Sequence, residues 1–286
     1  MAATINTNPM SLNAQRNLST SQSSLSQSVQ RLSSGLRVNS AKDDAAGLAI
    51  ADRMNAQAKG FDVAIRNAND GISMAQTAES AMQAITDNLQ RMRELAVQSA
   101  NGVYSSGDRA SLDTEFQQLN QEIARVVSGT QFNGQNVLSV TSDFSFQVGA
   151  GTASTDSIAV TSGQVGLASG TFGTTTAGSI SGATISGAGS AGVSNASAAI
   201  ASIDTAINAL NTARANWGAV QNRFTSVVQT LQVASENANA SRGRIMDADF
   251  AKETANMTRA QILQQAGTAM VAQANSMPNN VLSLLR

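Results

Sequence analysis

The sequence predicts a mainly α-helical protein. The expected architecture is a long antiparallel helical coiled-coil bundle built from both chain ends, with a small β-hairpin and a short Gly/Ser/Thr-rich variable segment. On both sides of the middle, apolar residues recur in alternating steps of about four and three, which is the spacing of one helical face. The two prolines, Pro9 and Pro278, lie near opposite ends, so proline interrupts no helix between them. Gly, Ser and Thr concentrate between Thr141 and Asn195, a low-complexity and almost uncharged stretch with nothing large enough for a core.

The first expected element is a helix near the N-terminus that stops at Gly35, because glycine favours helix ends. Its apolar residues follow a helical spacing and are Leu18, Leu25, Val29, Leu32 and Leu36. Ser40 then precedes Asp43 by three residues, a spacing that resembles a capping box. Asp43 and Asp44 are therefore expected in the first turn of a helix, where negative charge is favoured.

The most regular heptad pattern follows, and the stretch "NGVYSSGD" interrupts it. Its apolar positions are Phe61, Ile65, Ala68, Ile72 and Ala75 and, after one phase slip, Ala78, Met82, Ile85, Leu89, Met92 and Ala96. A second helix, ended by Gly129, has the same steps at Leu112, Phe116, Leu119, Ile123 and Val126. These two patterns predict a helical pair joined by a turn.

The stretches "DFSFQVGAG" and "DSIAV" predict a hairpin of two short strands before the variable stretch. Heptads return afterwards at Ile200, Ile203, Ile207 and Leu210 and, one slip later, at Trp217, Val220, Phe224, Val227 and Leu231. A last helix carries Met257, Ile262, Leu263, Met270 and Val271. Because no domain looks self-sufficient, the stripes from the two ends are expected to bury one another, with both termini together past one end of the bundle.

The C-terminal stretch "NNVLSLLR" is unusually apolar for a chain end. Burial of its four aliphatic side chains contributes less free energy than ordering the last eleven residues costs. We therefore expect the tail to order against other copies of the chain, which is folding coupled to assembly. The alternative is that the tail docks on its own bundle. If the tail orders against other copies, the contacts between copies need not close into a ring, and they then generate an open helical polymer.

Composition excludes several functions. The chain has no His and no Cys, which removes the usual general base, the commonest metal ligand and any thiolate chemistry. A net charge of −1 and 3% aromatic residues give no footprint for nucleic acid. No stretch approaches a membrane span, and the N-terminus lacks the apolar run of a Sec-type signal. No cofactor is expected.

Two short motifs are weak candidates for ligand sites. Adjacent residues on a helix diverge by about 100°, so Asp43 and Asp44 alone make a poor metal cage. Gly187 and Gly189 lack the third glycine of a phosphate-binding fingerprint. A Ser–Lys nucleophile pair is compatible with the composition, but no motif indicates one. An enzyme is the weakest interpretation.

Three long motifs resemble bacterial flagellins. They are "RLSSGLRVNSAKDDAAGLAIADRM" at residues 31–54, "LQRMRELAVQSANG" at residues 89–102 and "RAQILQQAGTAMVAQANSMPNNVLSLLR" at residues 259–286. The short motif "QFNG" also falls where that family has it. The resemblance covers about residues 1–150 and 197–286, in the same order, and is therefore very specific.

The resemblance implies a structural subunit that self-assembles into the helical flagellar filament used for motility. Residues 1–40 and 241–286 would form the two halves of an inner terminal-helix domain. Residues 41–140 and 198–240 would form the two halves of the core bundle. Residues 141–197 would hold the hairpin and a short variable segment with no large outer domain.

The resemblance also implies partners and location. The protein would be secreted through the flagellar type III apparatus and reside in the extracellular filament. Its partners would be copies of itself, a flagellar export chaperone, the filament cap and the hook–filament junction proteins. The residues expected in the filament interface are Leu18, Leu25, Val29, Leu32, Leu263, Val271, Val281, Leu282, Leu284 and Leu285.

A receptor site is a further implication, because members of the family are often detected by Toll-like receptor 5. The family's patch maps onto Arg91, Leu95 and Glu115. Arg91 and Leu95 are four residues apart and share a helical face, offset from the heptad seam and so expected to be open to a partner. The alternative is that Leu95 is ordinary core and Arg91 a solvated charge.

Two other classes of protein remain as alternatives. Chemoreceptor cytoplasmic domains are also long helical hairpins, but they keep their heptads through a tight tip and attach to a membrane span. Another type III-secreted tip or hook-associated protein has similar ends, and the "AQILQQAG" and "VLSLLR" runs favour flagellin over it. O-linked glycan on the Ser and Thr residues of 152–194 is as plausible an expectation as an unmodified loop.

Overall fold

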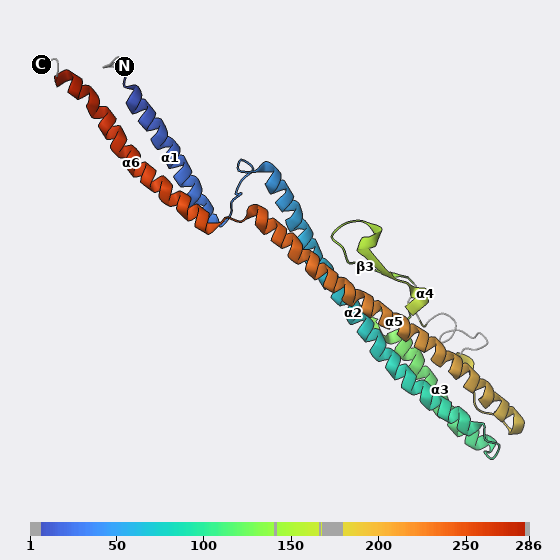
Figure 1. The fold of residues 1–286 in the computed structure, drawn as a ribbon. Helices are drawn as coiled ribbons and strands as arrows, with labels where there is room; N and C mark the ends of the chain where they lie inside the picture. Colours follow the sequence, from blue (N-terminus) through green and yellow to red (C-terminus); the bar gives the residue numbers. More distant parts are fainter. Residues whose placement is uncertain (1–6, 140–141, 166, 168–179, 284–286) are drawn as a thin grey trace. The chain divides into compact units, whose positions relative to one another are not determined.

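The computed structural model describes residues 7–139, 142–165, 167 and 180–283 (Figure 1). The predicted fold class, mainly helical with a small antiparallel hairpin, is confirmed. The long helices are α1 (Pro9–Ser34), α2 (Ala45–Ser99), α3 (Ser106–Gly129), α5 (Gly189–Met246) and α6 (Phe250–Ser283). The chain separates into two compact units, Met1–Gln57 with Glu236–Arg286 and Ala58–Ser235, and each is described by itself. We call them the terminal unit and the bundle unit.

In the terminal unit, α1 and α6 run side by side, and the start of α1 lies at the same end of the pair as the end of α6 (Figure 1). Asn8 caps α1, because its side chain accepts hydrogen bonds from the amides of Met10 and Ser11. As predicted, α1 stops at Gly35, which has a φ of 72° and donates its amide to the Arg31 carbonyl at 2.9 Å. At the opposite end of the pair, the segment after α1 and the segment before α6 form an isolated antiparallel β-bridge between Leu36 and Asp247.

The acidic pair Asp43–Asp44 organises the start of α2. Asp43 precedes the helix rather than lying in its first turn, and its carboxylate accepts hydrogen bonds from the amides of Asn39 and Ser40 and from the Ser40 hydroxyl. The Asn39 amide bond, followed by the two Ser40 bonds, lowers the pKa of Asp43 below its usual value. The Asp44 carboxylate accepts from the Gly47 amide at 2.8 Å. Within the described residues, no group of three or more potential metal ligands gathers anywhere.

The bundle unit packs α2, α3 and α5 around one apolar core. Three side-chain contacts show that α2 and α5 are antiparallel: Arg93 to Asp204, Glu79 to Arg214 and Asp62 to Ser235. Every α2 seam residue after the predicted phase slip is buried: Ala78, Met82, Ile85, Leu89, Met92 and Ala96. Before the slip, the predicted Ala68 and Ala75 are buried, but Phe61, Ile65 and Ile72 are only partly buried, and Ala64, Gly71 and Met74 face the interior with the two alanines. Gly71 lets α2 approach α5 so closely that a Cβ there would lie 2.7 Å from Phe224.

Two hairpins belong to the bundle unit. Strands β1 (Gln131–Phe132) and β2 (Gln135–Asn136) join through the tight turn of the "QFNG" motif. The predicted longer hairpin is confirmed as β3 (Phe144–Gln147) paired antiparallel with β4 (Ser157–Val160). The Phe146 ring meets the Phe224 ring edge to face, with centroids 5.2 Å apart. This aromatic contact fastens the hairpin to α5.

The expectation that the Gly/Ser/Thr-rich stretch contributes no core residues is wrong. Ile180 and Ile185 are fully buried, and Val165 and Leu167 also join the core. Helix α5 begins at Gly189, inside the stretch expected to be loose. Residues 166 and 168–179 of this stretch lie outside the described part. Isolated aliphatic residues among small ones have no helical period, so the sequence pattern did not reveal them.

The returning segment, residues 180–189, is held mainly through its backbone. A polar stripe on α3 makes these contacts, and we use "polar stripe" for its members Arg109, Asp113, Gln117 and Asn120. Asn120 and Gln117 donate to the carbonyls of Ile180 and Ala183 at 3.1 and 2.8 Å. The Asp113 carboxylate accepts from the Ile185 amide at 2.8 Å. Arg109, the last member of the polar stripe, donates hydrogen bonds to the carbonyls of Gly187 and Gly189.

Candidate functional site

The contact between α1 and α6 is built from small and polar residues. Among the described residues of these two helices, the buried ones are Ser11, Ser28, Glu253, Ala260 and Ala274. Gly267 also lies at the contact, because a Cβ there would stand 3.1 Å from the Leu18 side chain. Small side chains let two helices approach closely, but they bury little apolar area. The pair is therefore held by fit and hydrogen bonds more than by a core.

Hydrogen bonds fix the register of this pair at both ends. The Asn8 side-chain amide donates to the Ala274 carbonyl at 2.6 Å, and the Ser11 hydroxyl donates to the Asn275 side chain at 2.7 Å. At the other end, Arg31 forms a 3.1 Å ion pair with Glu253, whose side chain is almost buried. A one-residue slip between the helices would break all three contacts.

Large apolar side chains of the terminal unit face solvent. Eight such side chains described in α1 and α6 are 44–60% exposed: Met10, Leu12, Val29, Phe250, Ile262, Leu263, Met270 and Met277. In the described bundle unit, the large apolar side chains with comparable exposure are all valines: Val63, Val97, Val103 and Val233. An apolar surface of this density on a helix pair marks an interaction site.

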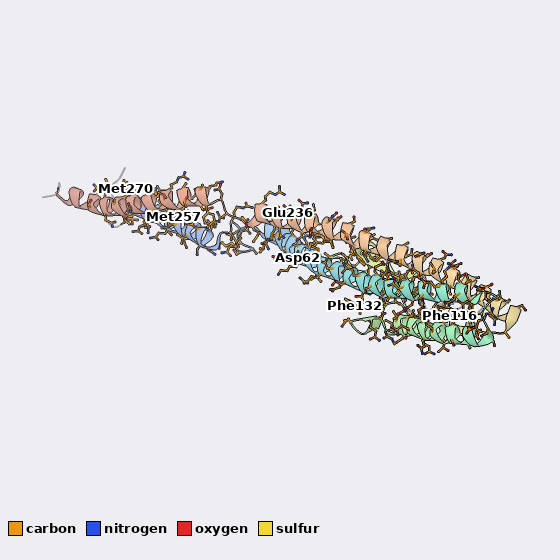
Figure 2. The ribbon with its side chains drawn as sticks, turned by 90° about the horizontal axis from the view of Figure 1, so that it is seen from below. Asp62, Phe116, Phe132, Glu236, Met257 and Met270 are labelled. Atoms are coloured by element: carbon orange, nitrogen blue, oxygen red, sulfur yellow. The ribbon has the colours of Figure 1, made fainter. Side chains whose placement is uncertain are left out.

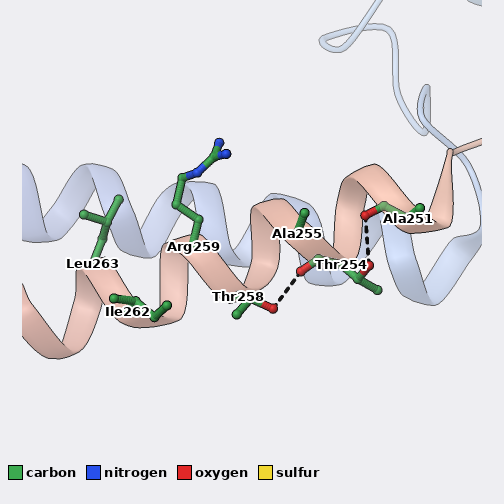
Figure 3. Close-up of a pocket in the computed structure, with 7 residues that line it drawn as sticks. All are labelled: Ala251, Thr254, Ala255, Thr258, Arg259, Ile262 and Leu263. Atoms are coloured by element: carbon green, nitrogen blue, oxygen red, sulfur yellow. Dashed lines mark hydrogen bonds between the residues drawn. The ribbon is translucent and has the colours of Figure 1, made fainter.

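Two shallow grooves follow this surface. One lies between the helices and is lined by Met10, Leu18, Leu263 and Met270, among others; Figure 2 labels Met270 on α6. The other runs along α6 from Ala251 to Leu263 (Figure 3). In that groove the hydroxyls of Thr254 and Thr258 donate to carbonyls of their own helix, so their hydroxyl hydrogens are not available to a partner. The groove therefore offers mainly apolar contacts.

The predicted interface residues divide into three groups. Val29 and Leu263 are exposed. Leu18, Leu25, Leu32 and Val271 are half-buried at the flanks of the pair. The side chains of Val281, Leu282, Leu284 and Leu285 lie outside the described residues.

The structure brings Arg91 and Glu115 together on the surface of the bundle unit. Arg91 Nε donates to Glu115 at 2.8 Å, and its Nη1 donates to Glu94 at 3.0 Å. The Glu115 hydrogen bond, followed by that of Glu94, raises the pKa of the Arg91 guanidinium. The three side chains are about half exposed or more. Sequence reasoning missed Glu94, although its spacing of three from Arg91 on a helix was the available signal.

The expectation that Leu95 is open to a partner is wrong for the isolated chain. Leu95 is 1% exposed and belongs to the apolar core. The physical reason is that both α3 and α5 cover this end of α2, so the buried stripe is wider than one heptad seam.

Arg109 is the functional residue that periodicity could not reveal. It is 1% exposed, and its guanidinium donates to the carbonyls of Ser99 and Asn101 at 2.9 and 3.1 Å in addition to Gly187 and Gly189. No described carboxylate pairs with it. It joins the end of α2, the start of α3 and the start of α5 at one point.

These features define a class of protein: a structural protein of long helices, with one well-filled bundle and one helix pair that leaves large apolar side chains exposed over the described residues. None of the helices, over the described residues, has the length and apolarity that crossing a membrane requires. The comparisons with known proteins give the family.

The chain belongs to the bacterial flagellin family. Residues 5–143 match the bacterial flagellin N-terminal helical region, and residues 200–285 match the bacterial flagellin C-terminal helical region. The chain is 44% identical to a flagellin of Halalkalibacterium halodurans and 42% identical to the flagellar filament 33 kDa core protein of Treponema phagedenis, each alignment covering 99% of both chains. A crystal structure of Bacillus cereus flagellin matches 58% of this chain and 88% of its own, with 32% identity and a TM-score of 0.47. The family comprises structural proteins of the flagellar filament.

Proposed function

We propose that this chain polymerises into the flagellar filament through the exposed apolar surface of α1 and α6. The observation that carries the proposal is the concentration of half-exposed large apolar side chains on a helix pair with almost no core of its own. Burial of such side chains between copies would contribute roughly 1.5–3 kcal/mol each. In the sequence, these exposed residues are followed by the four aliphatic residues of the tail, Val281, Leu282, Leu284 and Leu285.

The experiment is seeded elongation, in which purified chain is added to sheared fragments of its native filament and growth is followed by electron microscopy. A Leu263→Asp variant would place a charge in the contact and should lower elongation by about tenfold or more. Val103→Asp is the matched control, because Val103 is 86% exposed but lies in the α2–α3 turn. Equal elongation by both variants, with unchanged helicity, would refute the assignment to α1 and α6.

A truncation tests the tail separately. Deletion of Val281–Arg286 should abolish elongation and leave the bundle unit folded, since the described core contains none of these residues. Normal filaments from the truncated chain would remove the tail from the proposed interface.

Assembly in the filament brings further proposed partners. A chain of this kind would leave the cell through the flagellar type III apparatus with an export chaperone, and would meet the filament cap and the hook–filament junction proteins. The filament would lie outside the cell.

We further propose that the monomer is recognised by Toll-like receptor 5 at Arg91, Glu94 and Glu115, while Leu95 stays in the core. The supporting observation is the shared, half-exposed ion-pair cluster on α2 and α3. An Arg91→Ala chain should bind the receptor ectodomain more weakly than the parent. The control is Arg125→Ala, which removes another exposed arginine paired with a glutamate on α3. Undiminished binding by Arg91→Ala would refute this site.

A further inference from the structure

Asparagine followed by glycine occurs twice in the chain, at Asn101–Gly102 and at Asn133–Gly134. This dipeptide is chemically labile. Glycine has no side chain to block its backbone nitrogen from attacking the side-chain amide of the preceding asparagine. Both pairs have the same local chemistry, so any difference between them in the folded protein comes from backbone geometry.

Asn101–Gly102 lies in the turn between α2 and α3, where both residues are exposed. The Asn101 side-chain oxygen accepts a hydrogen bond from the Val103 amide at 3.2 Å. That bond closes an Asx turn across the Gly102 peptide, and a hydrogen bond to the side-chain oxygen polarises the amide carbon. In the described structure the Gly102 amide has no hydrogen-bond acceptor, and no heavy atom stands within 4 Å of a Cβ built on this residue.

Asn133–Gly134 is held in a different way. Asn133 has a φ of 50° and Gly134 a φ of 78°, both in the left-handed region of a two-residue hairpin turn. The paired residues of β1 and β2 on either side fix this geometry. We expect the pairing on both sides of the turn to oppose the backbone rotation that closes a five-membered ring between the Asn133 side chain and the next nitrogen.

We propose that Asn101–Gly102 is a self-modification site, at which the folded protein converts Asn101 to a mixture of aspartate and isoaspartate while Asn133 is protected. The Gly102 nitrogen bonds to Cγ of Asn101, and the Cγ–Nδ2 bond breaks. Nδ2 leaves as ammonia with the proton lost from Gly102. Water then opens the cyclic imide at either carbonyl, so the net reaction consumes one water and releases one ammonia.

The modification has a structural consequence at Arg109. The carbonyl oxygen of Asn101 accepts from Arg109 Nη2 at 3.1 Å and from the Tyr104 amide at 3.4 Å. An isoaspartate adds one carbon to the backbone at this position and displaces that oxygen. Because Arg109 also binds the carbonyls of Gly187 and Gly189, the displacement weakens the hold on the returning segment.

The test is ageing of the purified full chain in mildly alkaline buffer, followed by peptide mass spectrometry. Trypsin releases Glu94–Arg109, in which Asn101 is the single asparagine, and a chymotryptic peptide reports Asn133. Each conversion adds about 1 Da, and a protein-isoaspartate methyltransferase identifies the isoaspartate. We expect Asn101 to convert several-fold faster than Asn133 in the native protein. Equal native rates, or a faster Asn133, would overturn the proposal.

Two controls isolate the cause. In guanidinium chloride the rates at Asn101 and Asn133 should converge, because the folded backbone no longer separates them; a persistent difference would assign it to sequence instead. Gly102→Ala fits the open space at this position and should slow conversion at Asn101 alone. A Gly102→Ala chain that converts as fast as the parent would also overturn the mechanism.

Hydrogen exchange measures the link to Arg109. Aged protein enriched in isoaspartate should exchange the amides of residues 183–189 faster than fresh protein. Unchanged exchange in a sample shown to carry isoaspartate would overturn this link.

Discussion

At the scale of single residues, Arg109 has the most demanding environment in the described structure. A buried guanidinium is costly unless hydrogen bonds replace its hydration. Here four backbone carbonyls, those of Ser99, Asn101, Gly187 and Gly189, replace it, and two of them belong to the end of α2 and the turn after it. The negative end of a helix dipole favours a cation at this place. Arg109 thus binds three segments through atoms that every sequence possesses.

Replacement of Arg109 by Met keeps much of the side-chain volume and removes the donors. The carbonyls would stay buried without partners, so we expect a loss of about 1–3 kcal/mol in the free energy of unfolding. The amides of residues 183–189 should exchange faster with solvent. Arg125→Met is the control, since its ion pair with Glu122 is exposed to solvent and contributes little to stability. Equal effects of the two substitutions on stability and exchange would contradict the role given to Arg109.

At the scale of elements, the bundle unit combines a wide-spaced and a close-packed helix contact on the same helix α2. Large seam residues such as Met82 and Leu89 fill one part, whereas Gly71 permits the Phe224 ring to lie against the α2 backbone in the other. The same ring holds Phe146 of the β3–β4 hairpin. Gly71 therefore contributes to the position of both α5 and the hairpin on α2, together with the hydrogen bond from Asn67 to the Gln147 carbonyl.

A pair of glycine substitutions tests this packing. Gly71→Ala would put a Cβ 2.7 Å from the Phe224 ring, so we expect overpacking to cost about 1–3 kcal/mol in thermal or denaturant unfolding. Gly218→Ala, in the interior of α5, meets no heavy atom within 4 Å and should stabilise the protein by up to about 1 kcal/mol through helix propensity. Similar shifts in both variants would mean that propensity, and not contact with Phe224, determines the effect at Gly71.

Periodicity predicted the elements but not their surroundings. The heptads located the α2 seam after the phase slip and the most deeply buried positions of α3 and α5, because buried faces of long helices repeat in sequence. The burial of Leu95, Ile180 and Ile185 was not predictable in this way, since it depends on which neighbours cover a face. Arg109 and Asp113 were also missed. Their side chains bind backbone atoms, which every residue has, so no particular residue type in the sequence marks the partner.

At the scale of the whole molecule, the two units differ in how they are stabilised. The described bundle unit buries residues as large as Trp217, Phe116 and Phe224, whereas the buried apolar residues described in the terminal unit are Val38, Ala51, Ala260 and Ala274. Local stability follows buried apolar contact, so segments with little of it open at low free energy. This imbalance agrees with the proposed assembly through α1 and α6, because binding to neighbouring copies would stabilise the less stable unit.

The imbalance predicts hydrogen exchange along the chain. In the monomer, amides of α1 and α6 should exchange rapidly and those of Ile85–Ala96 and Ile203–Trp217 slowly, measured by mass spectrometry over a time series. In polymerised chain, α1 and α6 should become strongly protected, because neighbouring copies then cover Leu263 and Met270, while the bundle unit changes little. The Leu263→Asp chain, which is expected not to elongate, supplies the unpolymerised reference under the same conditions. Strong protection of α1 and α6 already in the monomer would show that the pair is stable alone, and assembly would then require a source of free energy other than its folding.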